Sequence, residues 1–130
     1  MKAFTSFALG LLVLWTVTAC QEDQEASVSS DKVTYEVITT SGNWYGEYIT
    51  ETGEKECICS QPLASSGWTY TFQTASKPFE LHIDATTECC ADQADAPDVT
   101  TNIYVNDVLV ASNTSNWAKG VASVDFILEK

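Results

Sequence analysis

The stretch Trp68-Thr69-Tyr70-Thr71-Phe72-Gln73-Thr74 carries the clearest structural pattern in this chain of 130 residues. Aromatic side chains occupy every second position, and polar side chains occupy the positions between them. Because successive side chains of a β-strand point to opposite faces of a sheet, the pattern predicts a half-buried strand. Its aromatic face, formed by Trp68, Tyr70 and Phe72, is expected to lie in the core.

Similar alternation recurs along the rest of the chain from residue 32 onward. Short runs of β-branched and aromatic residues are separated by Gly, Asn, Asp, Ser and Pro, and no segment of useful length has helical periodicity. Asn106-Asp107, a pair that tolerates positive φ, predicts a hairpin turn. Strands are expected at 32–39, 44–50, 56–60, 68–74, 79–85, 99–105, 108–112 and 121–128. This spacing is typical of an antiparallel all-β sandwich of seven or eight strands.

The N-terminus has the features of an exported, lipid-anchored protein. An apolar run at residues 3–15 is too short to span a bilayer comfortably, and Val17-Thr18-Ala19-Cys20 follows it closely. This tetrapeptide resembles the lipobox of bacterial lipoproteins, in which the Cys receives the lipid. The expected organisation is a signal peptide at 1–19, a lipidated acidic tether at 20–31 and a β-sandwich domain at 32–130.

The residues after Cys20 bear on the location of the protein. Gln21-Glu22-Asp23-Gln24-Glu25 resembles the acidic export signal of surface lipoproteins in the Bacteroidota. An acidic, flexible tether would have the same composition without being a signal. We therefore expect an outer-membrane lipoprotein exposed at the cell surface, with a periplasm-facing protein as the alternative.

The charge balance limits the classes of partner. The chain has 18 acidic residues against six basic ones and a formal net charge of −12, and every basic residue is Lys. Without Arg, the bidentate contacts that grip phosphates and guanine edges are not available, so nucleic acid is not expected as a partner. The same charge would repel anionic lipid head groups, so membrane attachment is expected through the lipid on Cys20.

Three segments carry a resemblance to a known family: Val33-Thr34-Tyr35-Glu36-Val37, the 68–72 strand, and Ile103-Tyr104-Val105-Asn106-Asp107-Val108-Leu109-Val110. They resemble the extracytoplasmic domain of the mycobacterial membrane protein small (MmpS) family, over roughly Val33 to Leu128. The resemblance implies an immunoglobulin-like β-sandwich and a role beside an envelope transporter. The chain differs from that family in having a lipobox in place of a transmembrane anchor and in carrying four additional cysteines.

Those four cysteines are the strongest chemical feature of the predicted domain. Cys57 and Cys59 flank one residue of a strand and so share a face, while Cys89 and Cys90 are adjacent in an acidic loop. In an oxidising compartment, two disulfides joining these pairs are expected, because a bridge within either pair would be strained. A thiolate metal site is the alternative, with His82 as an extra ligand, although the spacing matches no familiar zinc motif.

No catalytic constellation stands out, and the protein is expected not to be an enzyme. His82 is the only His, and it is expected to be a solvated surface imidazole on the face of Glu80 and Asp84. No nucleophile motif accompanies it. Neither a cofactor nor a dedicated metal site is expected. A further set of carboxylates lies at Glu88, Asp92, Asp95 and Asp98; it lacks EF-hand spacing and is interpreted as a solvated loop rather than a Ca²⁺ site.

Aromatic residues near turns offer a route to ligand binding. Trp44 and Trp117 are the candidates for an exposed edge on which a sugar ring or an apolar chain could stack. The sequence thus leaves three functions open. The favoured one is a non-enzymatic envelope protein that acts as an accessory or interaction domain with a protein partner. The alternatives are a small glycan- or lipid-binding module and a thiolate metal-binding lipoprotein.

Overall fold

The computed structural model describes residues 29–40, 44–58, 67–87, 97–116 and 118–129. Within these ranges it contains eight strands and no helix, which confirms the predicted all-β sandwich. The immunoglobulin-like subclass stays a prediction. The strands are β1 (Asp31–Thr39), β2 (Trp44–Ile49), β3 (Lys55–Ile58), β4 (Trp68–Thr74), β5 (Phe79–Thr87), β6 (Val99–Val105), β7 (Val108–Ser115) and β8 (Ala122–Leu128).

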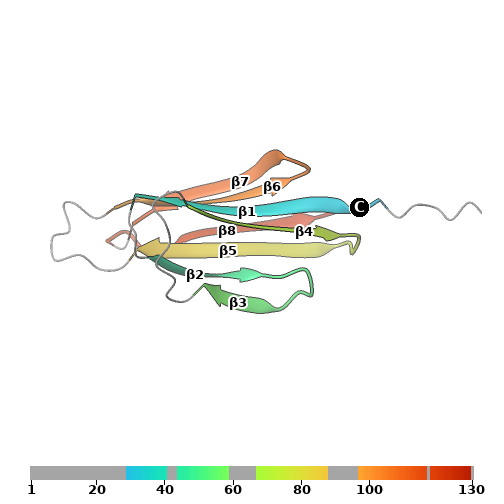
Figure 1. Ribbon diagram of the computed structural model, residues 1–130, viewed down its shortest axis with the longest axis horizontal. Helices are drawn as coiled ribbons and strands as arrows, with labels where there is room; N and C mark the ends of the chain where they lie inside the picture. The colour runs from blue at the N-terminus through green and yellow to red at the C-terminus, as the bar shows by residue number, and fades with distance from the viewer. Residues whose placement is uncertain (1–28, 41–43, 59–66, 88–96, 117, 130) are drawn as a thin grey trace, which may run out of the picture.

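The strands form two four-stranded sheets that face each other (Figure 1). The first sheet has the order β4-β1-β6-β7, and the second sheet has the order β3-β2-β5-β8. Every neighbouring pair is antiparallel. The chain crosses between the sheets several times, so each sheet combines strands that are distant in sequence.

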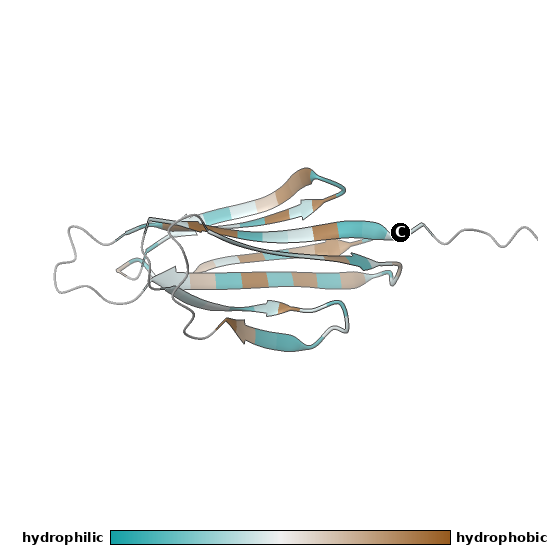
Figure 2. Cartoon of the chain, in the orientation of Figure 1, coloured by the Kyte–Doolittle hydropathy of each residue, from teal (hydrophilic) through white to brown (hydrophobic). Residues whose placement is uncertain are grey.

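The core lies between the sheets and is built from the predicted alternation. Val33, Tyr35 and Val37 of β1 are fully buried, as are Leu81 and Ile83 of β5. Figure 2 shows the alternation of apolar and polar residues along β5. The residues between them face outward and are mostly polar, with Ile38 as an exposed apolar exception on β1.

Aromatic rings fill the side of the core where β4 and β2 face each other. The ring of Tyr48 lies 5.2 Å from that of Trp68 and 4.8 Å from that of Tyr70. Phe72 is buried, whereas Trp68 and Tyr70 are only partly buried because β4 is an edge strand. The aromatic side chains of β4 thus point toward the core, as predicted. Two of its three rings form the margin of the core rather than its centre.

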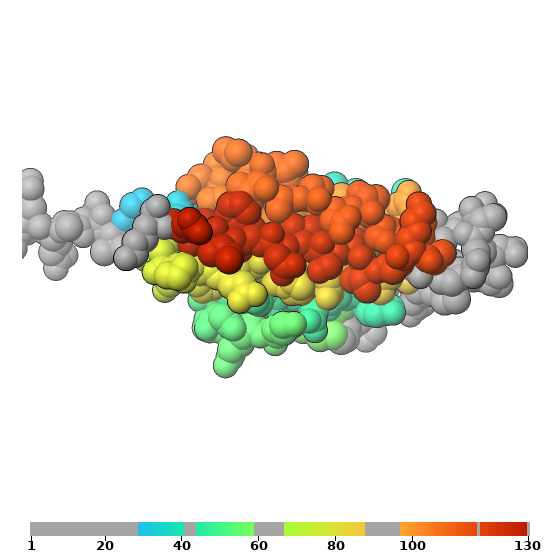
Figure 3. Space-filling view, turned by 180° about the vertical axis from the view of Figure 1, so that it is seen from behind, coloured from blue at the N-terminus to red at the C-terminus, as the bar shows by residue number. Residues whose placement is uncertain are grey.

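On the opposite side of the sandwich, the edge strands β7 and β8 lie side by side (Figure 3). Asn113 of β7 donates its side-chain N–H to the backbone oxygen of Ser123 in β8 at 3.0 Å. Thr101 of β6 donates its hydroxyl to the backbone oxygen of Ala122 at 3.2 Å. Side chains therefore bridge the two sheets here without forming a continuous ladder.

The β6–β7 connection is the predicted hairpin. Asn106 and Asp107 have φ values of 51° and 66°, the left-handed conformation expected of this pair. Asn106 also pairs with the start of β1, since its backbone N–H donates to the Lys32 oxygen at 2.8 Å and its side-chain oxygen accepts from the Lys32 N–H at 3.0 Å. The hairpin tip is thereby fixed against the beginning of the domain.

Two strands extend beyond their predicted ends. β5 continues through Thr87, where the sequence analysis placed the start of an acidic loop, because Thr86 and Thr87 pair with Tyr45 and Trp44 of β2. β7 continues to Ser115, which pairs with Val99. In both cases the partner strand provides hydrogen bonds that a local pattern does not reveal.

The beginning of β1 and the C-terminus lie at the same end of the sandwich (Figure 1). Lys77 and Asp31 form an ion pair of 2.7 Å at this end. Within the described ranges, no helix is long and apolar enough to cross a membrane.

Candidate functional site

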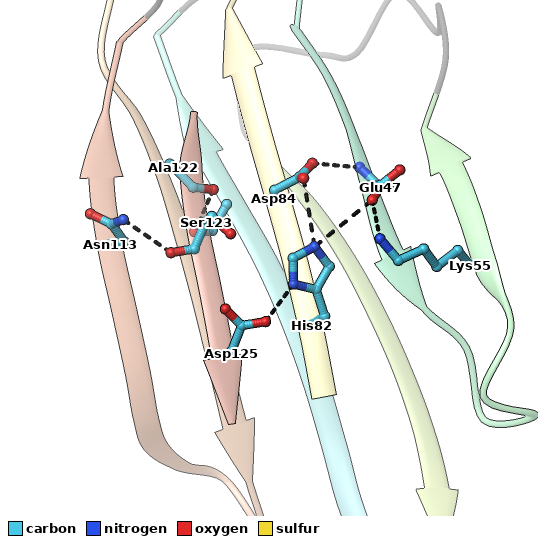
Figure 4. A network of polar contacts seen from close by, with 9 residues as sticks. Glu47, Lys55, His82, Asp84, Asn113, Ala122, Ser123 and Asp125 are labelled. Atoms are coloured by element: carbon cyan, nitrogen blue, oxygen red, sulfur yellow. Dashed lines mark hydrogen bonds and ion pairs between the residues drawn. The ribbon is translucent and has the colours of Figure 1, made fainter. Parts of the chain in front are cut away.

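The outer face of the second sheet gathers charged side chains from all four of its strands. Alternation turns Glu47 of β2, His82 and Asp84 of β5, and Asp125 of β8 outward, because their sequence neighbours are buried in the core. The strand register brings them together, with Glu47 opposite Asp84 and His82 opposite Asp125. Lys55 reaches this group from β3 (Figure 4).

His82 is the centre of the group. Its Nδ1 atom lies 2.7 Å from Asp125 Oδ1, and its Nε2 atom lies 3.6 Å from Asp84 Oδ2 and 4.0 Å from Glu47 Oε1. The His82 side chain is only 14% exposed, and Nε2 is buried with no hydrogen-bond partner in the described part of the chain. The expectation of a solvated imidazole is therefore wrong, because the carboxylates of neighbouring strands lie around the ring. Its predicted position on the face of Asp84 is correct.

The two carboxylates nearest His82 Nε2 are held by further contacts. Asp84 Oδ1 accepts the backbone N–H of Glu47 at 3.0 Å, which leaves Oδ2 toward His82. Glu47 Oε1 pairs with Lys55 Nζ at 2.5 Å. The hydrogen bond and charge of Lys55 lower the pKa of Glu47, and the same contacts raise the pKa of Lys55. Both shifts favour the ionised pair.

A pocket of about 240 Å³ adjoins this group. It shares Glu47 and Asp84 with the group and is otherwise bounded by residues of β2, β3 and β5 and by the residue before β8. These residues are Tyr45, Gly46, Cys57, Thr86 and Val121. The Glu47 and Asp84 side chains are 41% and 25% exposed, so solvent reaches both carboxylates.

The ligand-type atoms of Glu47, His82 and Asp84 all lie within 4.8 Å of one another. No other trio of His, Cys, Asp or Glu in the described ranges comes this close. Nε2 faces carboxylates rather than a hydroxyl, so the arrangement differs from a nucleophile paired with its base. The arrangement instead brings together one nitrogen and two oxygen atoms that could bind a metal ion.

Most of the predicted cysteine site lies outside the described residues. Cys57 is at an exposed position of β3, opposite Glu47, and its sulfur is disulfide-bonded. Cys59, Cys89 and Cys90 are not among the described residues, so the partner of Cys57 and the two-bridge pattern stay predictions. Cys20 also lies outside them, as do Glu88, Asp92 and Asp95. Asp98 accepts a hydrogen bond from the Asn116 side chain at 3.0 Å.

Trp44 does not form an exposed binding edge. Its side chain is only 3% exposed and belongs to the core, where its ring packs edge-on against Trp68 at 6.1 Å. This burial corrects the sequence-based expectation, which took proximity to a turn as a sign of exposure. The neighbouring Tyr45 is half exposed instead. Trp117 lies outside the described residues.

Comparison with known proteins adds no relative: no protein-family model matches the chain, and no curated protein matches it significantly. The resemblance to the MmpS family therefore stays a prediction. The fold and the site define a two-sheet all-β domain with a His-centred acidic cluster on one outer face.

Proposed function

We propose that the protein is a non-enzymatic, lipid-anchored protein of the cell envelope whose β-sandwich is an interaction domain, working beside an envelope transporter. The lipobox at Cys20 and the acidic tether support the anchor. The observation that carries the interaction role is the exposed apolar start of β7, where Val108 is 63% exposed and Leu109 is 50% exposed.

The position of these residues favours a protein partner. β7 is an edge strand of the first sheet, and edge strands offer backbone groups to which another chain can add a strand. Apolar side chains at such an edge would give the added strand its contact area. The exposed start of β7 follows the hairpin tip, which is attached to Lys32 near the proposed tether. A partner embedded in the membrane would thus meet this edge first.

The anchor is tested by replacing the proposed lipidated residue. We expect the full chain to incorporate labelled palmitate and to fractionate with the outer membrane, and Cys20→Ser to lose both properties. Protease treatment of intact cells then separates surface display from a periplasm-facing orientation. Label retained by Cys20→Ser would contradict the lipobox assignment.

The interaction role is tested by photo-crosslinking in intact cells. A photoreactive residue at position 109 should give one discrete adduct with an envelope protein. Position 38 is a matched control, because Ile38 is 48% exposed but lies on β1, a central strand. Equal adducts from both positions, or none from position 109, would contradict docking at the β7 edge.

Within this proposal the four cysteines of the domain stabilise the fold and do not bind a metal. We expect two disulfides that join Cys57 and Cys59 to Cys89 and Cys90. Intact mass under non-reducing conditions should be four hydrogens below that of the reduced chain, with no thiol of these residues open to alkylation. Four alkylatable thiols would favour the second candidate, a thiolate metal-binding lipoprotein. Burial of Trp44 leaves Trp117, which lies outside the described residues, as the remaining candidate for a glycan- or lipid-binding edge.

A further inference from the structure

We propose that Glu47, His82 and Asp84 form a binding site for a divalent transition-metal ion of the Zn²⁺ type. The site lies on the outer face of the second sheet, across strands β2 and β5 (Figure 4). Its donors are one imidazole nitrogen and two carboxylate oxygens, so it is distinct from the thiolate site considered for the cysteines.

The spacing of the donor atoms fits a small coordination sphere. His82 Nε2 lies 3.6 Å from Asp84 Oδ2 and 4.0 Å from Glu47 Oε1. Ligands at about 2.0 to 2.1 Å from a tetrahedral Zn²⁺ are about 3.3 Å apart. The three donor atoms lie within 4.8 Å of one another, so they must close by up to about 1.5 Å to bind an ion. The paired strands already hold their backbones in register.

Asp125 holds the imidazole in the orientation that metal binding requires. Its carboxylate accepts a hydrogen bond from His82 Nδ1 at 2.7 Å, and a carboxylate can only accept. A hydrogen is thus on Nδ1, and in the neutral imidazole this leaves the lone pair on Nε2, the atom nearest the two other carboxylates. Metal-binding histidines usually have such an outer carboxylate, which fixes the tautomer and ring orientation. Asp125 is a positioning residue here, not a ligand.

The site also needs positive charge. Glu47 and Asp84 are direct cross-strand neighbours, and like charges in that relation are destabilising. Lys55 forms an exposed ion pair with Glu47 and acts on Asp84 through its charge alone. His82 Nε2 is a buried polar atom with no hydrogen-bond partner among the described residues, and such atoms are costly. One divalent ion would bind Nε2 and neutralise both carboxylates.

The pocket gives the ion a route of entry and room for further ligands. Glu47 and Asp84 line it, and their side chains are 41% and 25% exposed. Three protein ligands with one position left to water are a common arrangement for accessible Zn²⁺ sites. Ca²⁺ and Mg²⁺ prefer oxygen ligands alone, so an imidazole at the centre favours a transition metal.

Titration calorimetry with ZnCl₂ tests the proposal on the full chain, purified in detergent with a C-terminal tag that contains no histidine. We expect one equivalent to bind. His82→Gln and Asp84→Asn should each weaken binding at least tenfold, and Asp125→Asn should weaken it by about 10- to 100-fold. Glu80→Gln is the matched control, because Glu80 is an exposed carboxylate of the same strand outside the ligand set; its affinity should stay within twofold.

Nuclear magnetic resonance gives a readout that does not depend on variants. His82 is the only His, so all imidazole signals of the chain come from one ring. Zn²⁺ should shift these signals saturably with the calorimetric stoichiometry, and Mn²⁺ should broaden them. Thermal melting of each variant without metal shows whether the fold is retained.

Three results would overturn the proposal: an imidazole signal unmoved by saturating Zn²⁺, binding retained within twofold in His82→Gln, or equal losses in Glu80→Gln and Asp84→Asn. Zn²⁺ binding that survives His82→Gln and disappears after cysteine alkylation would assign the metal to thiolates instead. None of these results bears on docking at the β7 edge, which the crosslinking experiment tests separately.

Discussion

The outer faces of the two sheets differ in how their polar groups are balanced. On the first sheet, neutral groups partner each other: Thr34 pairs with Thr71 and Thr100 with Thr114. Its Glu36 carboxylate accepts from Asn102 at 2.9 Å and from Tyr104 at 2.8 Å. On the second sheet, three carboxylates surround one His. Two sheets that bury apolar side chains in the same alternating pattern can thus differ on their outer faces. The polar groups named on the first sheet hydrogen-bond to one another, whereas the second sheet keeps His82 Nε2 without a partner among the described residues.

Gly46→Ala should disrupt the pairing of β2 with β5 in the second sheet. It alters none of the polar side chains on the outer face of the first sheet. A Cβ at position 46 would overlap the backbone oxygen of Asp84 and lie 3.0 Å from Ala85 Cα, and backbone atoms cannot move aside cheaply. We expect a loss of about 3 kcal/mol or more in the free energy of unfolding, measured by denaturant titration. Thr34→Ala, which removes one hydrogen bond from the first sheet, should cost under about 1 kcal/mol. A similar loss for both variants would show that β2 and β5 can separate at Gly46.

Amide replacements on the two faces should have different effects. Glu36→Gln loses a charged acceptor shared by two donors and should destabilise the domain by about 1 to 2 kcal/mol. Asp84→Asn keeps an oxygen for the Glu47 N–H while relieving repulsion, so it should change stability by less than about 0.5 kcal/mol. Unfolding is measured with a chelator present. Equal losses of unfolding free energy in the two variants would mean that the Asp84 carboxylate is stabilised by its neighbours as well as the Glu36 carboxylate is.

The link between the sheets at Tyr70 predicts a loss of stability at alkaline pH. Tyr70 of β4 donates its hydroxyl to Glu51, in the turn after β2, and this bond raises the pKa of Tyr70 to about 12. The folded state holds the proton more tightly than the unfolded state, whose tyrosine titrates near 10. The contribution is therefore complete below about pH 10 and is lost as the pH rises toward 12.

Unfolding midpoints measured from pH 8 to 12 test this expectation, with Tyr70→Phe as the control. The variant should show a shallower decline because it has no phenol at this position. Parallel declines in the two proteins would assign the pH dependence to other groups. Tyr48 also has a raised pKa, through burial and its bond to Glu56, so part of the slope should remain in the variant.

The smallest stability effects are expected at exposed ion pairs, one on each sheet. Lys32→Gln removes the pair with Asp107, and Lys55→Gln removes the pair with Glu47. Each should leave the unfolding midpoint nearly unchanged, because solvent screens exposed ion pairs. Only Lys55→Gln should strengthen Zn²⁺ binding, by about two- to fivefold, since it removes a competing cation. Unchanged affinity in Lys55→Gln would show that Lys55 does not compete with the ion for Glu47.

Features that depend on local geometry could be predicted from the sequence. The inward face of β1 follows from the two-residue period of a strand, as Val33 and Tyr35 show. The hairpin at Asn106 follows from the conformations that this residue type tolerates. Neither inference needs a distant partner.

Features that depend on strand register could not be predicted. His82 was correctly placed on an outward face with Asp84, but its contacts with Asp125 and Glu47 require the pairing of β5 with β8 and β2. Burial of Trp44 depends on Trp68, which reaches it from the other sheet. The one usable signal was a lone His two residues from an Asp on a polar strand face.

The central position of β1 also has a mechanical consequence. Antiparallel ladders join it to β4 on one side and to β6 on the other, along nearly its whole length. A load between the N-terminal end of β1 and the far end of the sandwich would run parallel to the strand and shear both ladders together. Such a load could not unzip them one bond at a time. With the anchor proposed for Cys20, tension on the tether would enter the domain through a strand that is paired on both sides.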